Sequence, residues 1–148
     1  MRILVDTNVF LDYLLQRENF ESAKLFFKMS YVYRNPLYIS SMSFRDIGYV
    51  VHRFYHNKED ARRAQIDAYK ICHKVLDISA DDAINSLYED DVDFEDCLLK
   101  EAAEREMIDV IVTNNVKDFR KLGFPALCVD EINSIYLNAK KEKTFIKF

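Results

Sequence analysis

Polar side chains that could bind a metal ion follow several short apolar runs in this chain of 148 residues. Asp6 comes directly after residues 3–5, and Asn115 lies shortly after residues 110–112. Asp46 lies in the helical pattern that follows the second apolar run. Apolar runs that alternate with helical patterns predict parallel strands, whose carboxyl ends meet at one edge of the sheet. We therefore expect these side chains to share one crevice.

A dense group of acids lies just before the fourth apolar run. Six of the eight residues 89–96 are acidic. Asp93 and Asp96 are spaced so that both carboxylates project from one side of a helix. Acids at a helix N-terminus complement the helix dipole, but this density exceeds what capping needs, and like charges repel unless a cation neutralises them. The cluster indicates a bound cation.

Each of these polar residues also has a purely structural interpretation. Asp6 is typical of a helix N-cap, and Asp46 forms with Ser43 a Ser-x-x-Asp pattern close to a capping box. Thr113 and Asn114 are equally typical of residues that cap a turn. What favours a site is the repetition of such residues after strands one, two and four and at the start of the helix that leads into strand four.

The ligand chemistry of this set is hard oxygen. No His or Cys occurs at the expected strand ends, and carboxylate, amide and hydroxyl oxygens suit Mg²⁺ or Mn²⁺ rather than Zn²⁺. Such an ion keeps several waters and takes further ligands from substrate phosphates. Hydrolysis of a phosphodiester by metal-activated water is the matching reaction. The polar set comprises Asp6, Thr7, Asn8, Asp46, Asp93, Asp96, Thr113, Asn114, Asn115 and Asp118.

Length and composition predict one compact domain with a hydrophobic core, since 49% of the residues are apolar and the chain is close to one domain length. Two glycines are too few for a Walker or Rossmann phosphate loop. Three cysteines match neither a disulfide framework nor a paired-Cys zinc site. No apolar run is long enough to span a bilayer, and an acid at position 6 comes too early for a signal peptide. A cytoplasmic location without membrane contact is therefore expected.

Five apolar runs and the helical patterns between them predict an α/β/α sandwich around a parallel sheet. The runs are residues 3–5, 37–39, 75–78, 110–112 and 127–129, and further helices are expected at 21–29, 59–72 and 94–105. The domain is expected to cover residues 1–139. A basic C-terminal tail, residues 140–148, is expected to be solvated.

The polar blocks and their order resemble a PIN-domain ribonuclease, of the kind found as the toxin of VapBC-type toxin–antitoxin pairs. The resemblance covers residues 4–129 and rests on four blocks: Val-Asp-Thr-Asn-Val-Phe-Leu-Asp, Ile-Ser-Ser-Met-Ser-Phe-Arg-Asp, Asp-Phe-Glu-Asp-Cys-Leu and Ile-Val-Thr-Asn-Asn-Val-Lys-Asp-Phe. It implies a five-stranded parallel sheet of order 3-2-1-4-5, which would bring Asp6 and Asn115 face to face.

The resemblance also implies roles for individual residues. Asp6 becomes the first metal ligand, Asp96 the third acid with Asp93 in support, and Asp118 the fourth. Asp46 stands where the family usually has Glu, and Asn115 stands where many members carry an acid. Thr7 and Thr113 are similar to hydroxyl residues that position a carboxylate or a water, with Asn8 beside them. One bound Mg²⁺ or Mn²⁺ is expected, and a second stays open.

Basic and aromatic side chains supply candidates for binding RNA or a partner. His52 and His56 have a spacing that can grip zinc, but no Glu follows the first His as in metalloproteases. Arg53, His56 and Arg62 are expected either to line a basic approach to RNA or to form a solvated helix face. The five aromatics of residues 31–55, Tyr31, Tyr33, Tyr49, Phe54 and Tyr55, favour core, a homodimer seam or a groove for an antitoxin over stacking on RNA bases.

The predicted function is a metal-dependent endoribonuclease and, by resemblance, the toxin of a type II toxin–antitoxin system. Two alternatives remain open. A PIN-like scaffold that binds RNA or a protein without efficient catalysis is compatible with Asp46 and Asn115 as weaker ligands. An aspartyl-phosphate phosphatase would use Asp6 as its nucleophile, but such enzymes want a second Asp two residues on, where this chain has Asn8.

Overall fold

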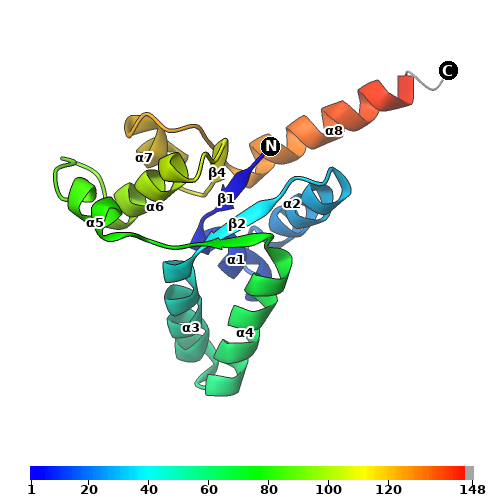
Figure 1. Cartoon of the computed structure of the whole chain (residues 1–148). Coiled ribbons are helices and arrows are strands. Elements are labelled where there is room, and N and C mark those ends of the chain that lie inside the picture. The colour runs from blue at the N-terminus through cyan, green and yellow to red at the C-terminus, as the bar shows by residue number, and fades with distance from the viewer. Residues whose placement is uncertain (146–148) are drawn as a thin grey trace.

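A five-stranded parallel sheet forms the centre of the molecule in this computed structural model, which describes residues 1–145. The strand order is β3-β2-β1-β4-β5, so the predicted order 3-2-1-4-5 is confirmed (Figure 1). Strand order reverses at β1, which pairs with both β2 and β4. The strands are β1 (Ile3–Val5), β2 (Leu37–Ser40), β3 (Lys74–Leu76), β4 (Val110–Val112) and β5 (Ala126–Leu127).

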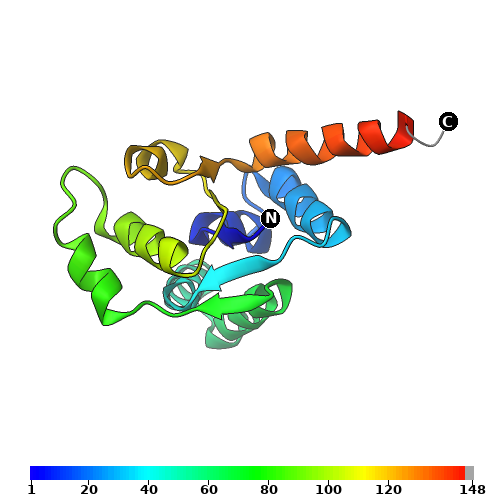
Figure 2. The same ribbon diagram turned by 45° about the horizontal axis from the view of Figure 1, so that its top comes forward.

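Helices cover both faces of this sheet, as the predicted α/β/α sandwich requires (Figures 1 and 2). In β1, Ile3 and Val5 point into the core shared with α1, α2, α3, α4 and α8, whereas Leu4 points into the core under α6 and α7. Side chains alternate between the two faces of a strand, so three apolar residues in a row predict burial on both sides. The helices are α1 (Thr7–Leu14), α2 (Phe20–Val32), α3 (Ser41–Tyr55), α4 (Lys58–Ile71), α5 (Ala80–Ser86), α6 (Phe94–Arg105), α7 (Val116–Lys121) and α8 (Val129–Phe145).

Small polar residues start most of these helices, as the sequence predicts. The side chains of Asp6, Ser40, Asn57 and Asp93 each accept a hydrogen bond from a backbone N–H of the first helical turn. Ser79 forms a full capping box with Asp82 at the start of α5. The capping-box interpretation of Ser43 and Asp46 is wrong, because α3 begins with Ser40 as its cap and Asp46 lies in the second turn.

Some boundaries differ from those expected. Strand β3 starts one position earlier than expected and ends two positions earlier, at Leu76, because the chain leaves the sheet to enter the Ser79 capping box. Strand β5 ends at Leu127, since the Cys128 carbonyl already accepts from the Ile132 N–H in the first turn of α8. Helix α8 continues past the expected domain end at residue 139. Residues 146–148 of the expected tail lie outside the described residues, so the tail stays a prediction.

Helices α3 and α4 form an antiparallel hairpin that projects from the sheet (Figure 1). Gly48 lies where they meet, and a Cβ there would collide with the side-chain amide of Gln65, whose Nε2 donates to the Phe44 carbonyl at 2.7 Å. A side chain at position 48 would displace the Gln65 amide and break this hydrogen bond.

The cysteines and the lengths of the helices can be compared with the sequence predictions within residues 1–145. The three cysteines are free, and Cys97 is buried while Cys72 and Cys128 are partly buried. None of the described helices combines the length and apolar character needed to cross a bilayer.

Candidate metal and catalytic site

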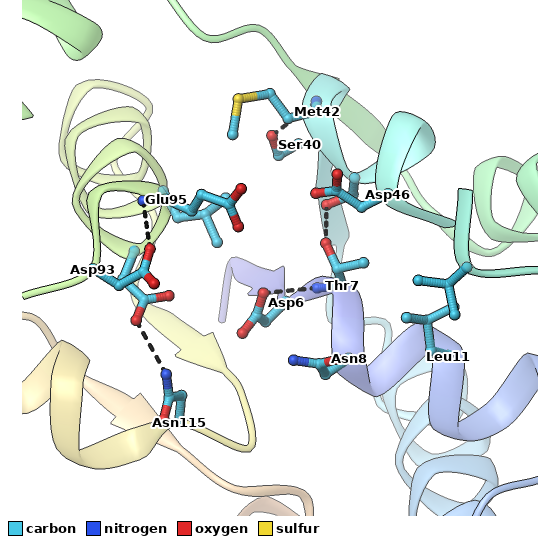
Figure 3. Close-up of a pocket in the computed structure, with 14 residues that line it drawn as sticks. Asp6, Thr7, Asn8, Leu11, Ser40, Met42, Asp46, Asp93, Glu95 and Asn115 are labelled. Atoms are coloured by element: carbon cyan, nitrogen blue, oxygen red, sulfur yellow. Dashed lines mark hydrogen bonds between the residues drawn. The ribbon is translucent and has the colours of Figure 1, made fainter. Parts of the chain in front are cut away.

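A cavity of about 250 Å³ lies where β1 and β2 end and α6 begins (Figure 3). It is the crevice expected at the switch point of an open parallel sheet. Five predicted acidic or amide positions from four separate segments meet there, together with Thr7 and Asn8. The lining residues are Asp6, Thr7, Asn8, Leu11, Ser40, Met42, Ser43, Asp46, Val50, Asp93, Glu95, Asp96, Leu99 and Asn115.

Asp6 is fixed at the centre of this site by two donors. Its side chain is 8% exposed. One carboxylate oxygen accepts from the Thr7 N–H at 2.8 Å, and the other accepts from the Thr113 hydroxyl at 2.8 Å. Asp6 is thus both the N-cap of α1 and a member of the cavity wall, so the structural and the functional interpretation of this residue hold together.

Asp96 is held in a similar way from the other side. It is also 8% exposed, and its Oδ2 accepts from the Asn115 side-chain amide at 3.1 Å. The backbone N–H of Asn115 donates to the Thr113 hydroxyl at 2.9 Å. A continuous chain of hydrogen bonds therefore runs from Asp6 through Thr113 and Asn115 to Asp96.

Burial raises the pKa of both carboxyls, and the charge of Asp6 raises the pKa of Asp96 further. Burial raises the pKa of Asp6, with a further contribution from the charge of Asp46 and opposing hydrogen bonds from Thr113 and Thr7. Burial, followed by the charges of Asp6, Asp93 and Asp118, raises the pKa of Asp96 to about 7. Among the described residues neither Asp6 nor Asp96 forms an ion pair. A bound cation would stabilise the ionised forms of these two carboxylates.

Asp46 reaches the cavity from α3 but is already engaged. Its Oδ1 accepts from the Arg45 guanidinium at 3.0 and 3.1 Å. The same guanidinium lies 3.8 Å from Glu95. Asp46 has a shorter side chain than Glu, and Arg45 already occupies its Oδ1. While this ion pair lasts, at most one carboxylate oxygen of Asp46 is available to the cavity.

The remaining predicted residues lie around this centre. Asp93 caps α6 through the Glu95 N–H at 2.8 Å, and its exposed carboxylate borders the cavity. The Thr7 hydroxyl donates to Ser43 at 2.8 Å. Asp118 is not among the lining residues, although its charge raises the pKa of Asp96. Asp118 thus neighbours the cavity without bordering it.

The donor set fits a hydrated divalent ion better than a closed protein cage. Within the described part of the chain, no three His, Cys, Asp or Glu side chains are placed to hold a metal together. Mg²⁺ is commonly bound through one or two carboxylates, with waters and phosphate oxygens completing its shell. Asp6 and Asp96, with their raised pKa values and no paired cation, match that mode. His52 and His56 belong to no such group, so no third residue of these types is placed beside them to complete a zinc site within residues 1–145.

Sequence reasoning missed several residues around the site. Glu95 and Met42 border the cavity, and Arg45 controls Asp46. Asp12 is 5% exposed and accepts from the Asn114 side chain at 2.9 Å. The sequence signal was present for Asp12, because an acid within an otherwise apolar helix face is unusual and needs a partner.

A PIN-domain family model matches residues 2–117. The chain belongs to the PIN-domain family. The match includes Asp6, Asp46, Asp96 and Asn115, and with the observed strand order it confirms the resemblance that the polar blocks indicate.

Solved structures of toxins share the fold of this PIN domain. VapBC2 from Rickettsia felis, bound to a DNA fragment from their promoter, matches at 20% identity and TM-score 0.66, over 86% of this chain and 98% of that one. Mycobacterium tuberculosis VapC20, a sarcin-ricin loop cleaving toxin, matches at 17% identity and TM-score 0.63, over 82% of this chain and 95% of that one. A toxin–antitoxin complex from Klebsiella pneumoniae matches at 22% identity and TM-score 0.56, over 79% of this chain and 89% of that one. No curated protein sequence matches the chain.

The raised pKa of Asp96 predicts how stability depends on pH. Below about pH 3 the Asp96 carboxyl is protonated in both the folded and the unfolded chain, so it costs no stability. As the pH rises toward 7 the unfolded chain ionises first, and the metal-free fold loses roughly 3 kcal/mol. Asp96→Asn should flatten this slope in denaturation experiments with chelator at pH 5 to 8. The exposed Asp90→Asn is the control, and an equal slope in wild type and Asp96→Asn would count against the buried charge.

Thr113 gives a second prediction, because its buried hydroxyl both donates to Asp6 and accepts from Asn115. Thr113→Val keeps the shape and removes both hydrogen bonds, so the unfolding free energy should fall by about 1–3 kcal/mol. Thr113→Ser should retain most of it. Chemical denaturation measures both variants, and equal stability of the Val and Ser variants would show that the hydroxyl contributes little.

Proposed function

We propose that this PIN-domain protein is a Mg²⁺- or Mn²⁺-dependent endoribonuclease. The observation that carries the proposal is the pair of buried, unpaired carboxylates, Asp6 and Asp96, joined by Thr113 and Asn115 at the mouth of a polar cavity. Perturbed acids in a cavity mark functional sites more often than structural ones. The fold shared with VapC20, a sarcin-ricin loop cleaving toxin, supports RNA as the substrate.

The residues divide the work as follows. Asp6 and Asp96 would hold the ion, with Asp93 and Asp46 at the border of the cavity and Asp118 adding negative charge nearby. When bound, the divalent ion supplies activation of water and compensation of charge on a phosphate. Thr113 keeps Asp6 oriented, and Asn115 does the same for one oxygen of Asp96. Thr7 and Asn8 line the floor beside Asp6.

A shallow basic groove between α3 and α4 is the proposed path of the RNA strand. Its lining contains Arg45, Tyr49, His52, Lys58 and Arg62 and no acid. Arg45 lines this groove and bonds to Asp46, which lines the metal site, so the groove adjoins the site. Net charge is −4 overall, and cations gathered in one place favour phosphate contact.

Two of the residues expected to bind RNA have other surroundings. Arg62 lines the groove, whereas Arg53 and His56 are not among its lining residues. Arg53 donates to the Tyr49 hydroxyl at 3.4 Å, and His56 forms the C-cap of α3 in a left-handed conformation. Their contact with RNA stays a prediction.

We further propose the role of a type II toxin that binds an antitoxin and forms a homodimer. The interpretation of the early aromatics as core residues is wrong for Tyr31, Tyr49, Phe54 and Tyr55, which are 50–86% exposed. Tyr33 is partly buried and stacks on Tyr136. Exposed aromatics of this number favour a partner surface. The fold shared with a toxin–antitoxin complex from Klebsiella pneumoniae supports the same role.

The toxin role is tested by expression of the protein in cells. Growth arrest that is relieved by the product of a neighbouring gene is the expected result.

The scaffold alternative is favoured by one observation, the Arg45 guanidinium bonded to Asp46. It differs from the nuclease in a measurable way, because a scaffold needs no divalent ion. The phosphatase alternative is disfavoured by the PIN-domain match and by Asn8 at the second acid position.

The central prediction of the nuclease concerns Asp6→Asn. This substitution keeps the shape and can keep the cap of α1, but it removes the charge that holds the ion. Cleavage of RNA in Mg²⁺ or Mn²⁺ should fall at least about a hundredfold, and the melting temperature should change little. Chelator should abolish wild-type cleavage as well. Asp130→Asn on the surface of α8 is the control. Full cleavage by Asp6→Asn would reject the mechanism, whereas metal-independent RNA binding without any cleavage would favour the scaffold.

The basic groove generates its own prediction. Replacing Lys58 and Arg62 by Ala should weaken binding of a single-stranded RNA by about tenfold at low salt, and the dependence of binding on salt should become shallower. Binding is measured in chelator, so cleavage does not interfere. The matched control replaces Arg34 and Lys70, two exposed cations outside this groove. An equal loss in both double variants would mean that the groove is not a path for RNA.

A further inference from the structure

A further buried acid, Asp12, lies outside the cavity and has no role in the site described above. It lies in α1 and is 5% exposed, although it carries a carboxylate. Asp12 does not line the metal cavity. A buried carboxylate is costly unless other groups satisfy it, so its partners show what the fold gains from it.

Two side chains contact the Asp12 carboxylate. Asn114 Nδ2 donates to Oδ2 at 2.9 Å. Arg17 Nη1 lies 3.9 Å from Oδ1, at the limit of an ion pair, and the arginine side chain is 39% exposed. The short contact is therefore the one with Asn114, which lies 102 residues away in the loop after β4.

The position of Asn114 makes this contact important. Its two neighbours are Thr113, which donates to Asp6, and Asn115, which donates to Asp96. A single loop of three residues thus holds both buried carboxylates of the site, and its middle residue is tied to α1 by Asp12. Helix α1 itself begins at the Asp6 cap, so both ends of this linkage belong to the same rigid element.

We propose that Asp12 is a positioning residue that acts through Asn114. It keeps Thr113 and Asn115 where they can donate hydrogen bonds to Asp6 and Asp96. The inference rests on the proposed divalent-ion site and deepens it. Partners of ligand residues typically change metal affinity ten- to a hundredfold when they are removed. Asp12 contributes at one remove, through the loop, and touches neither substrate nor ion.

The variants separate this role from a merely structural one. Asn114→Ala removes the donor at an exposed position, so the fold is expected to survive. Asp12→Ala removes the acceptor, whereas Asp12→Asn keeps an oxygen that can accept from Asn114 and loses only the charge. Asn85→Ala is the matched control, because Asn85 is an exposed amide that donates to a carboxylate elsewhere, Glu101 at 3.5 Å.

Two measurements are made on each full-length variant. The first is the affinity for Mn²⁺ by calorimetry, and the second is hydrogen exchange at the Asn115 backbone N–H, which donates to Thr113. Asn114→Ala and Asp12→Ala should each weaken Mn²⁺ binding about tenfold and speed exchange about tenfold. Asp12→Asn should restore both to near wild type, and the double Ala variant should be no worse than either single one.

The outcomes distinguish this inference from the proposed function. Wild-type affinity for Mn²⁺ in both Ala variants, with a lower melting temperature alone, would overturn the positioning role. If wild type itself binds no Mn²⁺, the proposed function fails, and the exchange measurement then decides: unchanged exchange at Asn115 in Asn114→Ala would overturn the inference as well.

Discussion

The repulsion between two buried carboxylates, Asp6 and Asp96, is the constraint on which the rest of this structure depends. Each is almost fully removed from water, and the charge of Asp6 contributes to the raised pKa of Asp96. The fold tolerates them because neutral donors hold them: a backbone N–H, the Thr113 hydroxyl and the Asn115 amide. Neutral donors fix geometry without cancelling charge, so the negative charge remains for a ligand to use.

The parallel sheet explains how this arrangement arises from distant parts of the chain. Because β1 and β4 are neighbours in register, Val5 lies beside Val112, and the residues that follow each strand must meet. The same residues begin the next helices, so one side chain serves as both cap and site member. Asp6 is the clearest example, since α1 starts where the site starts. The unrelieved charge lowers the stability of the fold, and the proposed divalent cation would offset that loss.

Much of this arrangement could be predicted from the sequence because it is encoded locally. A run of apolar residues followed by a capping residue can be recognised within a short stretch of sequence. The strands and the positions of Asp6 and Asp96 could therefore be predicted. The strand order came from the resemblance to PIN domains and not from periodicity. Contacts across more than 100 residues, such as Asp12 with Asn114, leave no local trace beyond an odd buried acid. The hydrogen bonds of Arg45 to Asp46 depend on a rotamer, which no spacing rule gives.

A crystal soaked in Mn²⁺ and measured at a wavelength where manganese scatters anomalously tests the central claim most directly. The account predicts an anomalous peak in the cavity between the carboxylates of Asp6 and Asp96, with waters completing the shell, and no such peak in crystals of Asp6→Asn. A peak confined to the acidic loop at residues 89–91, or none at millimolar Mn²⁺, would contradict it.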